Sequence, residues 1–396
     1  MNRQDAPERT YDVVLFGATG FVGALTAEYL AAHAPADCRW ALAGRDTGKL
    51  ERLRERLTAL HPHCAKLPLL RADATDPQAV RELAADTRVL ATTVGPYIWY
   101  GAELVAACAE AGTDYLDLTG EPEFVDRMYV EHDARARETG ARIVHACGFD
   151  SIPADLGAYF TVRQLPEGVP LTVDGFMRGG GLFSGGTLAS ALTALGRGPQ
   201  ALNAARERRL HEPRLLGRRA RGPVGAPRFS RETGTWALPL PTLDPQIVAR
   251  SAAALDRYGP DFRYRHYASV KHLPIAVGAT VAVGAAAAVA QVPAARNWLM
   301  NRWEPGQGPD AERRARSWFS VRFVGEGGGR RVLTEVAGGD PGYGETAKML
   351  GESALCLAYD ALPATSGQLT TAVAMGDALL DRLRQAGIRF RVADVR

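Results

Sequence analysis

The stretch VVLFGATGFVG, residues 13–23, decides the fold that we predict for this chain. Four apolar residues end at Phe16, and glycines then stand at positions 17, 20 and 23, where helical spacing begins. The first glycine permits a tight turn, the second lets the backbone approach a ligand closely, and the third lets the helix pack on its strand. Unpaired N–H groups at a helix start attract phosphate. The stretch therefore predicts a binding loop for the pyrophosphate of a dinucleotide.

The first 150 residues repeat this alternation of strand and helix. Short apolar runs lie at 11–16, 40–43, 67–70, 89–94, 115–118 and 143–146. Helical patterns lie between them, near 21–33, 47–60, 77–86, 101–111 and 123–139. Apolar strands that alternate with amphipathic helices indicate a parallel sheet covered on both faces. We predict an α/β fold, a doubly wound Rossmann-type parallel sheet with a second α+β domain.

The pattern changes after residue 150, and a length of 396 residues favours two domains. Residues 319–338 read as two strands joined by a Gly-rich turn, which predicts an antiparallel hairpin. We place a nucleotide-binding domain at 1–150 and a second domain, for substrate binding or dimerisation, at 151–341. We expect residues 342–396 to form C-terminal helices, which could pack back on the first domain.

The end of the second strand indicates which nucleotide is bound. Gly44 and Arg45 stand where an acidic residue would hold a ribose 2′-hydroxyl, and an arginine there suits a 2′-phosphate. NADP is therefore favoured over NAD, although Asp46 could serve the hydroxyl one position later. The other residues expected to bind the cofactor are Gly17, Ala18, Thr19, Gly20, Phe21, Val22, Gly23, Asp73, Ala74, Thr93, Val94, Gly95 and Pro96.

Composition excludes several classes of protein. The formal net charge of +3 is too small to indicate nucleic-acid binding. The five cysteines are scattered and form no CxxC motif, so we expect free thiols in a reducing cytosol and no metal site. The first 12 residues are polar and lack the apolar core of a signal peptide. We expect a cytoplasmic globular protein.

Two segments stand apart from these patterns. Residues 206–231 hold nine arginines against Glu207 and Glu212. The simplest interpretation is a solvated loop, and the alternative is a docking surface for an acidic carrier or for anionic lipid headgroups. Residues 273–290 carry no charge and are rich in alanine. A helix of that length would reach about 27 Å, barely a membrane core. A buried helix, or one lying against a membrane or an apolar substrate, is favoured over a span.

Several further motifs carry a resemblance to a known family. They are AGR (43–45), VGPY (94–97), YLDLTGE (115–121), CGFDSIPADLG (147–157), SGGT (184–187) and GYGETAKM (342–349). With the glycine loop, they make the chain resemble the saccharopine dehydrogenase-like oxidoreductases. The resemblance is closest to the trans-acting enoyl reductases of lipid and polyketide assembly, and it runs from residue 11 to about 357. It implies an NADP-binding domain, a second α+β domain and the reduction of a small or carrier-bound substrate.

The chemistry implied by the resemblance requires a proton donor. A nicotinamide cofactor carries the hydride, so the protein has to align it and supply or orient a proton. For an enoyl thioester, the hydride would reach the β-carbon and the donor would protonate the α-carbon. We expect the donor to be Tyr97 or Tyr100, beside the nicotinamide loop, or Asp150 or Ser151 opposite them. Each has a structural alternative: Tyr97 could pack on the ring, and Asp150, followed by Ser151 and Pro153, could cap a helix.

A further set is expected to hold a substrate carbonyl or phosphate, with plain helix capping as the alternative: Ser151, Ser184, Gly185, Gly186 and Thr187. Tyr267 and Lys271 have the Tyr-x-x-x-Lys spacing of short-chain dehydrogenases. However, they follow a strand-like run some 250 residues beyond the glycine loop, so we do not expect them to be a catalytic pair.

Three functions stay open at this point. The first is an NADP-dependent enoyl reductase acting on a lipid-like or polyketide substrate. The second is a saccharopine-type amino-acid dehydrogenase, whose dicarboxylate substrate would need clustered basic groups at the cleft. The third is a non-catalytic, membrane-associated NADP-binding protein. The partners that fit are a small-molecule or carrier-bound acyl substrate, an acyl carrier protein, a peripheral membrane contact and a second copy in a homodimer.

Overall fold

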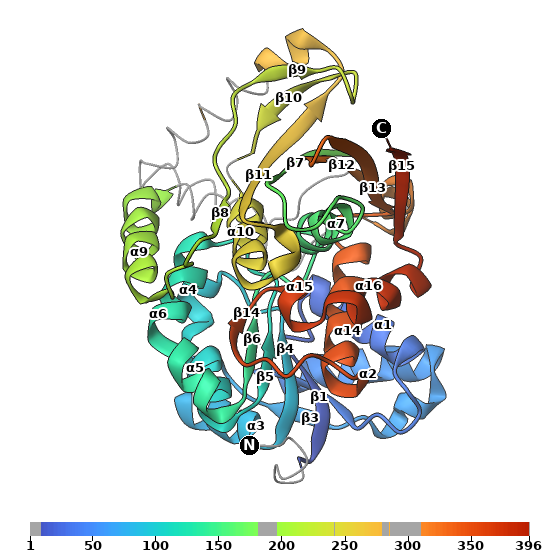
Figure 1. Cartoon of the computed structure of the whole chain (residues 1–396). Coiled ribbons are helices and arrows are strands. Elements are labelled where there is room, and N and C mark those ends of the chain that lie inside the picture. Colours follow the sequence, from blue (N-terminus) through green and yellow to red (C-terminus); the bar gives the residue numbers. More distant parts are fainter. Residues whose placement is uncertain (1–8, 181–195, 241, 279–284, 286–309, 396) are drawn as a thin grey trace.

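Two sheets organise the chain, one above the other in the view of Figure 1. The computed structural model describes residues 9–180, 196–240, 242–278, 285 and 310–395. Substrate-binding residues predicted at Ser184, Gly185, Gly186 and Thr187, and most of the apolar segment 273–290, lie outside these ranges. None of the helices in the described ranges combines the length and the apolar character that a membrane crossing requires.

The lower sheet confirms the predicted doubly wound fold. Its seven strands run parallel in the order β14-β6-β5-β4-β1-β2-β3. They are β1 (Tyr11–Phe16), β2 (Trp40–Gly44), β3 (Leu69–Arg71), β4 (Thr87–Thr92), β5 (Asp114–Leu116), β6 (Arg142–Val144) and β14 (Gly367–Leu369). The strand order reverses between β1 and β4, which is the place where such sheets bind nucleotides.

Helices cover both faces of this sheet. Val13 and Leu15 of β1 enter one buried cluster, whereas Val14 and Phe16 enter another, as side chains alternate along a strand. The helices of the first 150 residues are α1 (Phe21–His33), α2 (Thr47–Leu60), α3 (Pro77–Ala85), α4 (Tyr97–Tyr100), α5 (Ala102–Ala111) and α6 (Pro122–Thr139), with a 3-10 turn, η2 (Pro62–Lys66). One helix from the C-terminal part, α14 (Gly344–Tyr359), packs against α1, β1 and β4.

The second sheet is mixed and has eight strands in the described residues. Its order is β15-β13-β12-β7-β11-β10-β9, with β8 paired to β11. The strands are β7 (Leu171–Gly180), β8 (Arg219–Arg221), β9 (Arg228–Ser230), β10 (Thr235–Pro239), β11 (Asp261–Val270), β12 (Trp318–Gly327), β13 (Arg330–Gly338) and β15 (Arg389–Val395). The other helices in the described ranges are α7 (Ile152–Val162), α9 (Gly198–His211), α10 (Asp244–Ala254), η3 (Asp256–Tyr258), α13 (Ala311–Arg316), α15 (Thr371–Ala374) and α16 (Gly376–Gln385). The antiparallel pairing of β12 with β13 agrees with the predicted hairpin.

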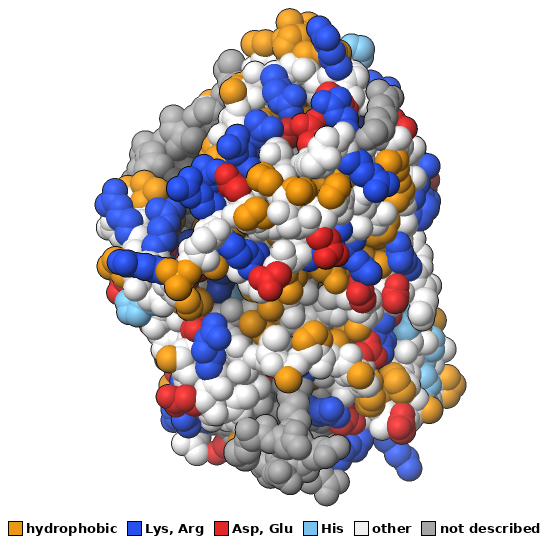
Figure 2. All heavy atoms as spheres, in the orientation of Figure 1, with side chains coloured by type: hydrophobic (Ala, Val, Ile, Leu, Met, Phe, Trp, Pro, Cys, Tyr) orange, Lys and Arg blue, Asp and Glu red, His pale blue; other side chains and the backbone are white. Residues whose placement is uncertain are grey.

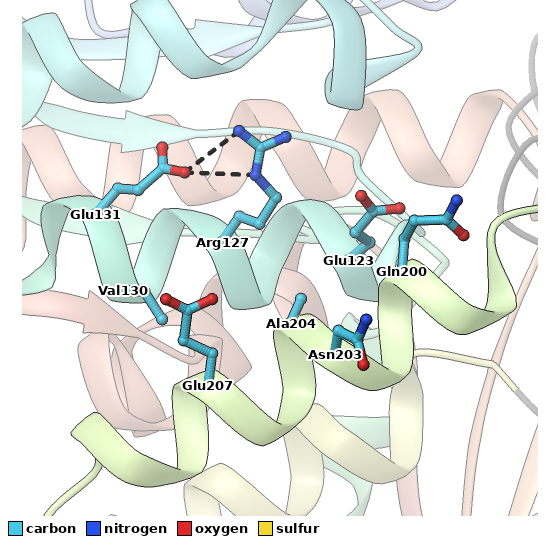
Figure 3. Close-up of a pocket in the computed structure, with 8 residues that line it drawn as sticks. All are labelled: Glu123, Arg127, Val130, Glu131, Gln200, Asn203, Ala204 and Glu207. Carbon is cyan, nitrogen blue, oxygen red and sulfur yellow. Dashed lines mark hydrogen bonds and ion pairs between the residues drawn. The ribbon is translucent and has the colours of Figure 1, made fainter.

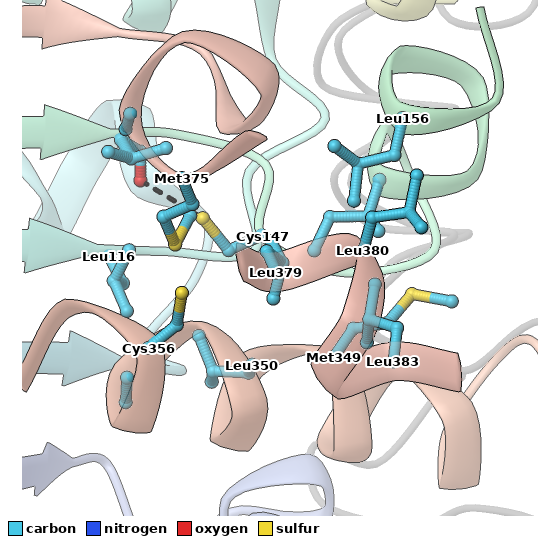
Figure 4. Close-up of a cluster of buried hydrophobic side chains, with 14 of the residues drawn as sticks. Leu116, Cys147, Leu156, Met349, Leu350, Cys356, Met375, Leu379, Leu380 and Leu383 are labelled. Carbon is cyan, nitrogen blue, oxygen red and sulfur yellow. Dashed lines mark hydrogen bonds between the residues drawn. The ribbon is translucent and has the colours of Figure 1, made fainter. Parts of the chain in front are cut away.

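One buried cluster joins the two sheets, as Figure 4 shows. Leu116 comes from the first sheet, Leu156 from α7, and Leu350 and Leu379 from the C-terminal helices. Cys147 is buried in the same cluster, and burial raises the pKa of its thiol. All five cysteines are free thiols, as the sequence predicts. The C-terminal part is thus divided between the sheets, since β14 extends the first and β15 the second.

The arginine-rich segment 206–231 is not the simple solvated loop that the sequence favours. Its first residues complete α9, and short strands follow at β8 and β9. Arg208 is buried, with its Nε 2.6 Å from Asp126 Oδ1 of α6. Arg218, Arg221 and Arg228 also pair with acidic residues. The charge pattern was misleading because four of these arginines find partners far away in the sequence.

Candidate functional site

The three glycines of the first loop are required for different geometric reasons. Gly17 has φ of +81°, and a Cβ there would lie 2.5 Å from Val94 Cγ2. A Cβ on Gly23 would lie 2.3 Å from the carbonyl oxygen of Gly17. At Gly20 a Cβ would meet only that same oxygen, at an ordinary 3.4 Å. Packing therefore requires two of the glycines, whereas the position of Gly20 is open toward an approaching ligand.

The start of α1 leaves N–H groups available for an anion. Gly20 is the N-cap residue, no side chain caps the helix, and no acidic residue lies in its first turn. Gly20 N donates to the carbonyl of Gly17 (3.0 Å), and the first backbone bond of the helix runs from Ala24 N to Gly20 O (2.8 Å). The amides of Phe21, Val22 and Gly23 precede that bond, as the first N–H groups of any helix do. They fit the pyrophosphate of a dinucleotide.

The residues after β2 favour a 2′-phosphate. Arg45 is exposed, whereas Asp46 is the N-cap of α2, where its Oδ1 accepts a hydrogen bond from Lys49 N (2.9 Å). Asp46 is therefore already used as a helix cap, which weakens the alternative that it holds a ribose hydroxyl. Asp73 Oδ1 accepts hydrogen bonds from the amide and hydroxyl of Thr75, and these bonds, with the nearby charge of Arg45, lower the pKa of Asp73.

The loop predicted to lie near the nicotinamide contacts the glycine loop directly. Thr93 Oγ1 donates to the carbonyl of Gly17 (3.0 Å), and the side chain of Val94 faces the Cα of Gly17. The next residues are held by Glu121, which accepts hydrogen bonds from Tyr97 N (3.0 Å) and Ile98 N (2.9 Å). The loops that follow β4 and β5 are thus joined to each other beside the first helix.

The two tyrosines proposed as donors differ in environment. Tyr97 is 4% exposed; its hydroxyl donates to Thr92 O (3.2 Å) and accepts from Leu118 N (3.1 Å). Burial raises the pKa of Tyr97 well above its ordinary value. Tyr100 is 40% exposed at the end of α4. The hydroxyl of Tyr97 therefore joins two loops, and the geometry favours a positioning role over proton donation.

Asp150 has the environment of an acid that holds its proton near neutral pH. It is exposed to solvent, yet it lies against the loop after β5, where a Cβ on Gly120 would be 3.7 Å from its carboxyl carbon. Desolvation of its carboxyl group by that contact, with the nearby carboxylates of Asp244 and Asp117, raises the pKa of Asp150 to about 7. The helix-capping alternative gains no support, because Ser151 is the N-cap of α7 and no side chain caps that helix.

Sequence reasoning missed the acidic residues that surround Asp150. Asp117 is buried, and its Oδ2 lies 2.6 Å from His145 Nδ1. Its Oδ1 accepts hydrogen bonds from Thr119 N and Ala146 N. Asp244, at the start of α10, is buried, and this raises its pKa to about 7. The acids in YLDLTGE were a signal for Asp117 and Glu121, but nothing in the sequence places Asp244 beside Asp150.

Other predicted or possible sites have simpler explanations. Ser151 is buried, and its hydroxyl has no hydrogen-bond partner among the described residues. Tyr267 is buried and stacked on Phe176, whereas Lys271 is exposed after the end of β11. In the described ranges no group of three or more His, Cys, Asp or Glu residues is placed to hold a metal.

A hollow between α6 and α9 contains none of the predicted site residues (Figure 3). Its lining includes Glu123, Glu131 and Glu207. Two of these carboxylates are already paired, Glu131 with Arg127 and Glu123 with Arg197. The hollow therefore has little free charge with which to recognise a ligand.

The chain is similar to known proteins over nearly all of its length. Residues 13–144 match the family model of the saccharopine dehydrogenase NADP-binding domain, which confirms NADP as the cofactor. A Mycobacterium tuberculosis protein provisionally named a trans-acting enoyl reductase is 42% identical, with 98% of each chain covered. A Mycobacterium ulcerans protein named a trans-acting enoyl reductase is 37% identical, covering 96% of this chain and 97% of that one. Saccharopine dehydrogenase (L-Glu forming) of Saccharomyces cerevisiae has the same fold, with a TM-score of 0.57, 13% identity, and coverage of 96% of this chain and 99% of that one.

Proposed function

Because the chain belongs to the saccharopine dehydrogenase-like oxidoreductases, in the branch of the trans-acting enoyl reductases, we propose that it reduces the enoyl double bond of a lipid-like or polyketide acyl thioester. The observation that supports this proposal is a run of contacts: Thr93, after β4, contacts the glycine loop, and Glu121, after β5, binds the amide of Tyr97. Asp150, whose pKa is about 7, lies against the same loop after β5. These loops lie at the carboxyl ends of the parallel strands, the edge where ligands of open α/β sheets bind.

The cofactor would be held by groups of the first domain. The amides at the start of α1 would bind the pyrophosphate and Arg45 the 2′-phosphate. The loop from Thr93 to Pro96 would lie along the nicotinamide, since it contacts the glycine loop. Bound NADPH supplies a hydride, which would add to the β-carbon of the substrate.

Asp150 would complete the reaction as the proton donor. When the β-carbon gains the hydride, the electron pair of the double bond moves to the α-carbon and the thioester oxygen. The carboxyl group of Asp150 would then give its proton to the α-carbon and become a carboxylate. A pKa of about 7 leaves a large fraction of this acid protonated at neutral pH. The product is a saturated acyl thioester, and solvent would restore the proton to Asp150.

The charges around Asp150 also bear on the substrate. Desolvation of the Asp150 carboxyl group raises its pKa, and the nearby carboxylates of Asp244 and Asp117 raise it further. A dicarboxylate such as saccharopine would be repelled by these groups. A thioester is neutral at its reacting end, so it suits this environment better than the amino-acid substrate of the alternative hypothesis.

Purified protein with NADPH and crotonyl-pantetheine tests the proposal. We expect NADPH oxidation together with formation of butyryl-pantetheine, identified by mass spectrometry. A matched reaction contains lysine and 2-oxoglutarate in place of the thioester. NADPH oxidation in that reaction alone would replace the enoyl reductase with a saccharopine-type dehydrogenase. Tight NADPH binding without turnover of either substrate would contradict both.

A further inference from the structure

One face of α9 presents arginines and leucines to solvent. Leu202, Arg206, Arg209 and Leu210 are all exposed, and their i, i+4, i+7, i+8 spacing places them on one stripe of the helix. The opposite side is fixed against α6, where Arg208 is buried in its ion pair with Asp126. The outward direction of the stripe is therefore set by packing on the other side of the same helix.

The arginines on this face lack the acidic partners that neighbouring arginines have. Within 206–231, ion pairs in the described residues use Arg208, Arg218, Arg221 and Arg228. Five arginines of this segment form no ion pair with any acidic side chain in the described ranges of the chain. They are Arg206, Arg209, Arg214, Arg219 and Arg231. Their charge is therefore available to an external partner.

Large apolar side chains lie among these charges. Leu202 is 63% exposed, Leu210 85% and Leu216 91%. Figure 2 shows basic and apolar side chains together at the left edge, at about mid-height, where Figure 1 places α9. We call the set Leu202, Arg206, Arg209, Leu210, Arg214 and Leu216 the Arg–Leu surface. Apolar side chains as exposed as these leucines are unfavourable in water, and a group of them is a candidate for contact with another protein.

The helix that carries this surface is attached to the loop beside the cofactor site. Arg197, the residue before α9, forms two hydrogen bonds of 2.7 Å with the carboxylate of Glu123. Its guanidinium lies 5.3 Å from the ring centre of Trp99 in α4. Tyr97, in the same short helix, hydrogen bonds to Glu121 and to Leu118. The start of α9 is therefore joined to the short helix that follows the predicted nicotinamide loop.

We propose that the Arg–Leu surface docks an acidic carrier-protein domain that presents the acyl thioester to the site. This inference rests on the proposed function, since it names the partner that would deliver its substrate. Unpaired arginines complement an acidic helix, and the leucines supply apolar contact between them. A lipid surface fits less well, because membrane-binding helices separate a continuous apolar face from a charged one. Here Arg206 and Arg209 stand between Leu202 and Leu210 on one stripe.

Charge reversal on the full chain tests the docking. The test variant is Arg206→Glu with Arg209→Glu, and the control is Arg81→Glu, an exposed arginine on α3. The first measurement is the dissociation constant of an acidic acyl carrier protein by fluorescence anisotropy, at low and at high salt. We expect the double variant to bind at least about 10-fold more weakly and to lose most of the salt dependence, because opposite charges at the contact are removed. The control should bind like the unaltered protein.

The second measurement compares two forms of one substrate. Crotonyl-pantetheine should be reduced equally by both variants, whereas the crotonyl group on the carrier protein should show a KM at least about 10-fold higher in the double variant alone. Equal loss with both substrates, or an equal effect of Arg81→Glu, would overturn the docking surface. So would loss of binding to phosphatidylglycerol vesicles without loss of carrier binding, which would assign the surface to lipid. If neither thioester is reduced, the proposed function fails, and the binding measurement still decides the docking.

Discussion

The predicted cofactor-binding loop and the proposed proton-donor side of the site are assembled in different ways. The loop is one continuous stretch, and its three glycines lie within seven residues. The donor side joins Tyr97 after β4, Glu121 after β5, Asp150 after β6 and Asp244 at the start of α10. Backbone geometry is encoded locally, whereas the pKa of an acid depends on whichever charges the fold brings near it.

The largest effect is expected on NADPH binding, and it should distinguish Gly20 from Gly23 of the same loop. Gly20→Val should weaken NADPH binding at least ~1000-fold, about 4 kcal/mol, because the new side chain would occupy the open space where the backbone meets the pyrophosphate. Its thermal unfolding midpoint should stay near that of the unaltered protein, since a Cβ at this position meets no close contact. Titration by intrinsic fluorescence, with a melting curve, measures both.

Gly23→Val is the matched control for this loop. Its Cβ would lie 2.3 Å from the Gly17 carbonyl oxygen, so the variant should lose stability as well as binding. If Gly20→Val melted as low as Gly23→Val, or if it bound NADPH normally, the division into a packing glycine and a ligand-facing glycine would be wrong.

The same contrast explains how much the sequence revealed. The strands predicted at 11–16, 40–43 and 143–146 correspond to β1, β2 and β6, because buried parallel strands are short apolar runs. The strand β14 was not recognisable, since its three residues, Gly367–Leu369, carry no such pattern. Its place at the edge of the first sheet is decided by pairing with β6, more than 200 residues earlier.

The next effect concerns proton donation. Asp150→Asn should lower kcat/KM for crotonyl-pantetheine about 100-fold, because an amide cannot act as the acid. In the unaltered protein kcat/KM should be level at acidic pH and fall as pH rises through about 7, where Asp150 loses its proton. The residual activity of the variant should not show this fall. NADPH oxidation from pH 5.5 to about 9 provides both profiles.

The thermal stability of the Asp150→Asn variant distinguishes a role in proton donation from a purely structural role. The pKa of Asp150 is raised in the folded protein, so any stability that the protonated acid provides is present at low pH and lost as pH rises through about 7. Asp150→Asn removes the charge that its surroundings disfavour, and it should melt no lower than the unaltered protein at pH 8. A lower midpoint with an unchanged pH profile would show that the residue only supports the fold.

A smaller effect is expected at the nucleotide-selecting position. Arg45→Ala should raise the dissociation constant for NADPH about 30-fold, about 2 kcal/mol, since a charge-assisted contact with the 2′-phosphate is lost. The constant for NADH should change less than about 3-fold, because NADH lacks that phosphate. Asp46→Ala should act on the stability of α2 instead, through loss of its cap. Equal effects of Arg45→Ala on both nucleotides would remove the case for phosphate recognition.

The arginine-rich segment shows where composition misleads. The nine arginines of 206–231 look alike in the sequence, yet Arg208 is buried against Asp126 and Arg206 is exposed. The difference depends on which side of α9 faces α6, and that is a tertiary property. The sequence could predict a docking surface here, but only the structure shows which arginines have no acidic partner among the described residues.

The smallest effect on turnover is expected at the buried tyrosine. Tyr97→Phe should leave kcat for crotonyl-pantetheine within about 2-fold, because its hydroxyl already bonds Thr92 O and Leu118 N. The free energy of unfolding should fall by about 1–2 kcal/mol, as the Leu118 amide loses its acceptor. Denaturant unfolding and steady-state kinetics on one preparation measure the two quantities. If Tyr97→Phe lowered kcat as much as Asp150→Asn does, with unchanged stability, Tyr97 would be the donor. The proton would then come from the VGPY loop that follows β4, and not from the loop that follows β6.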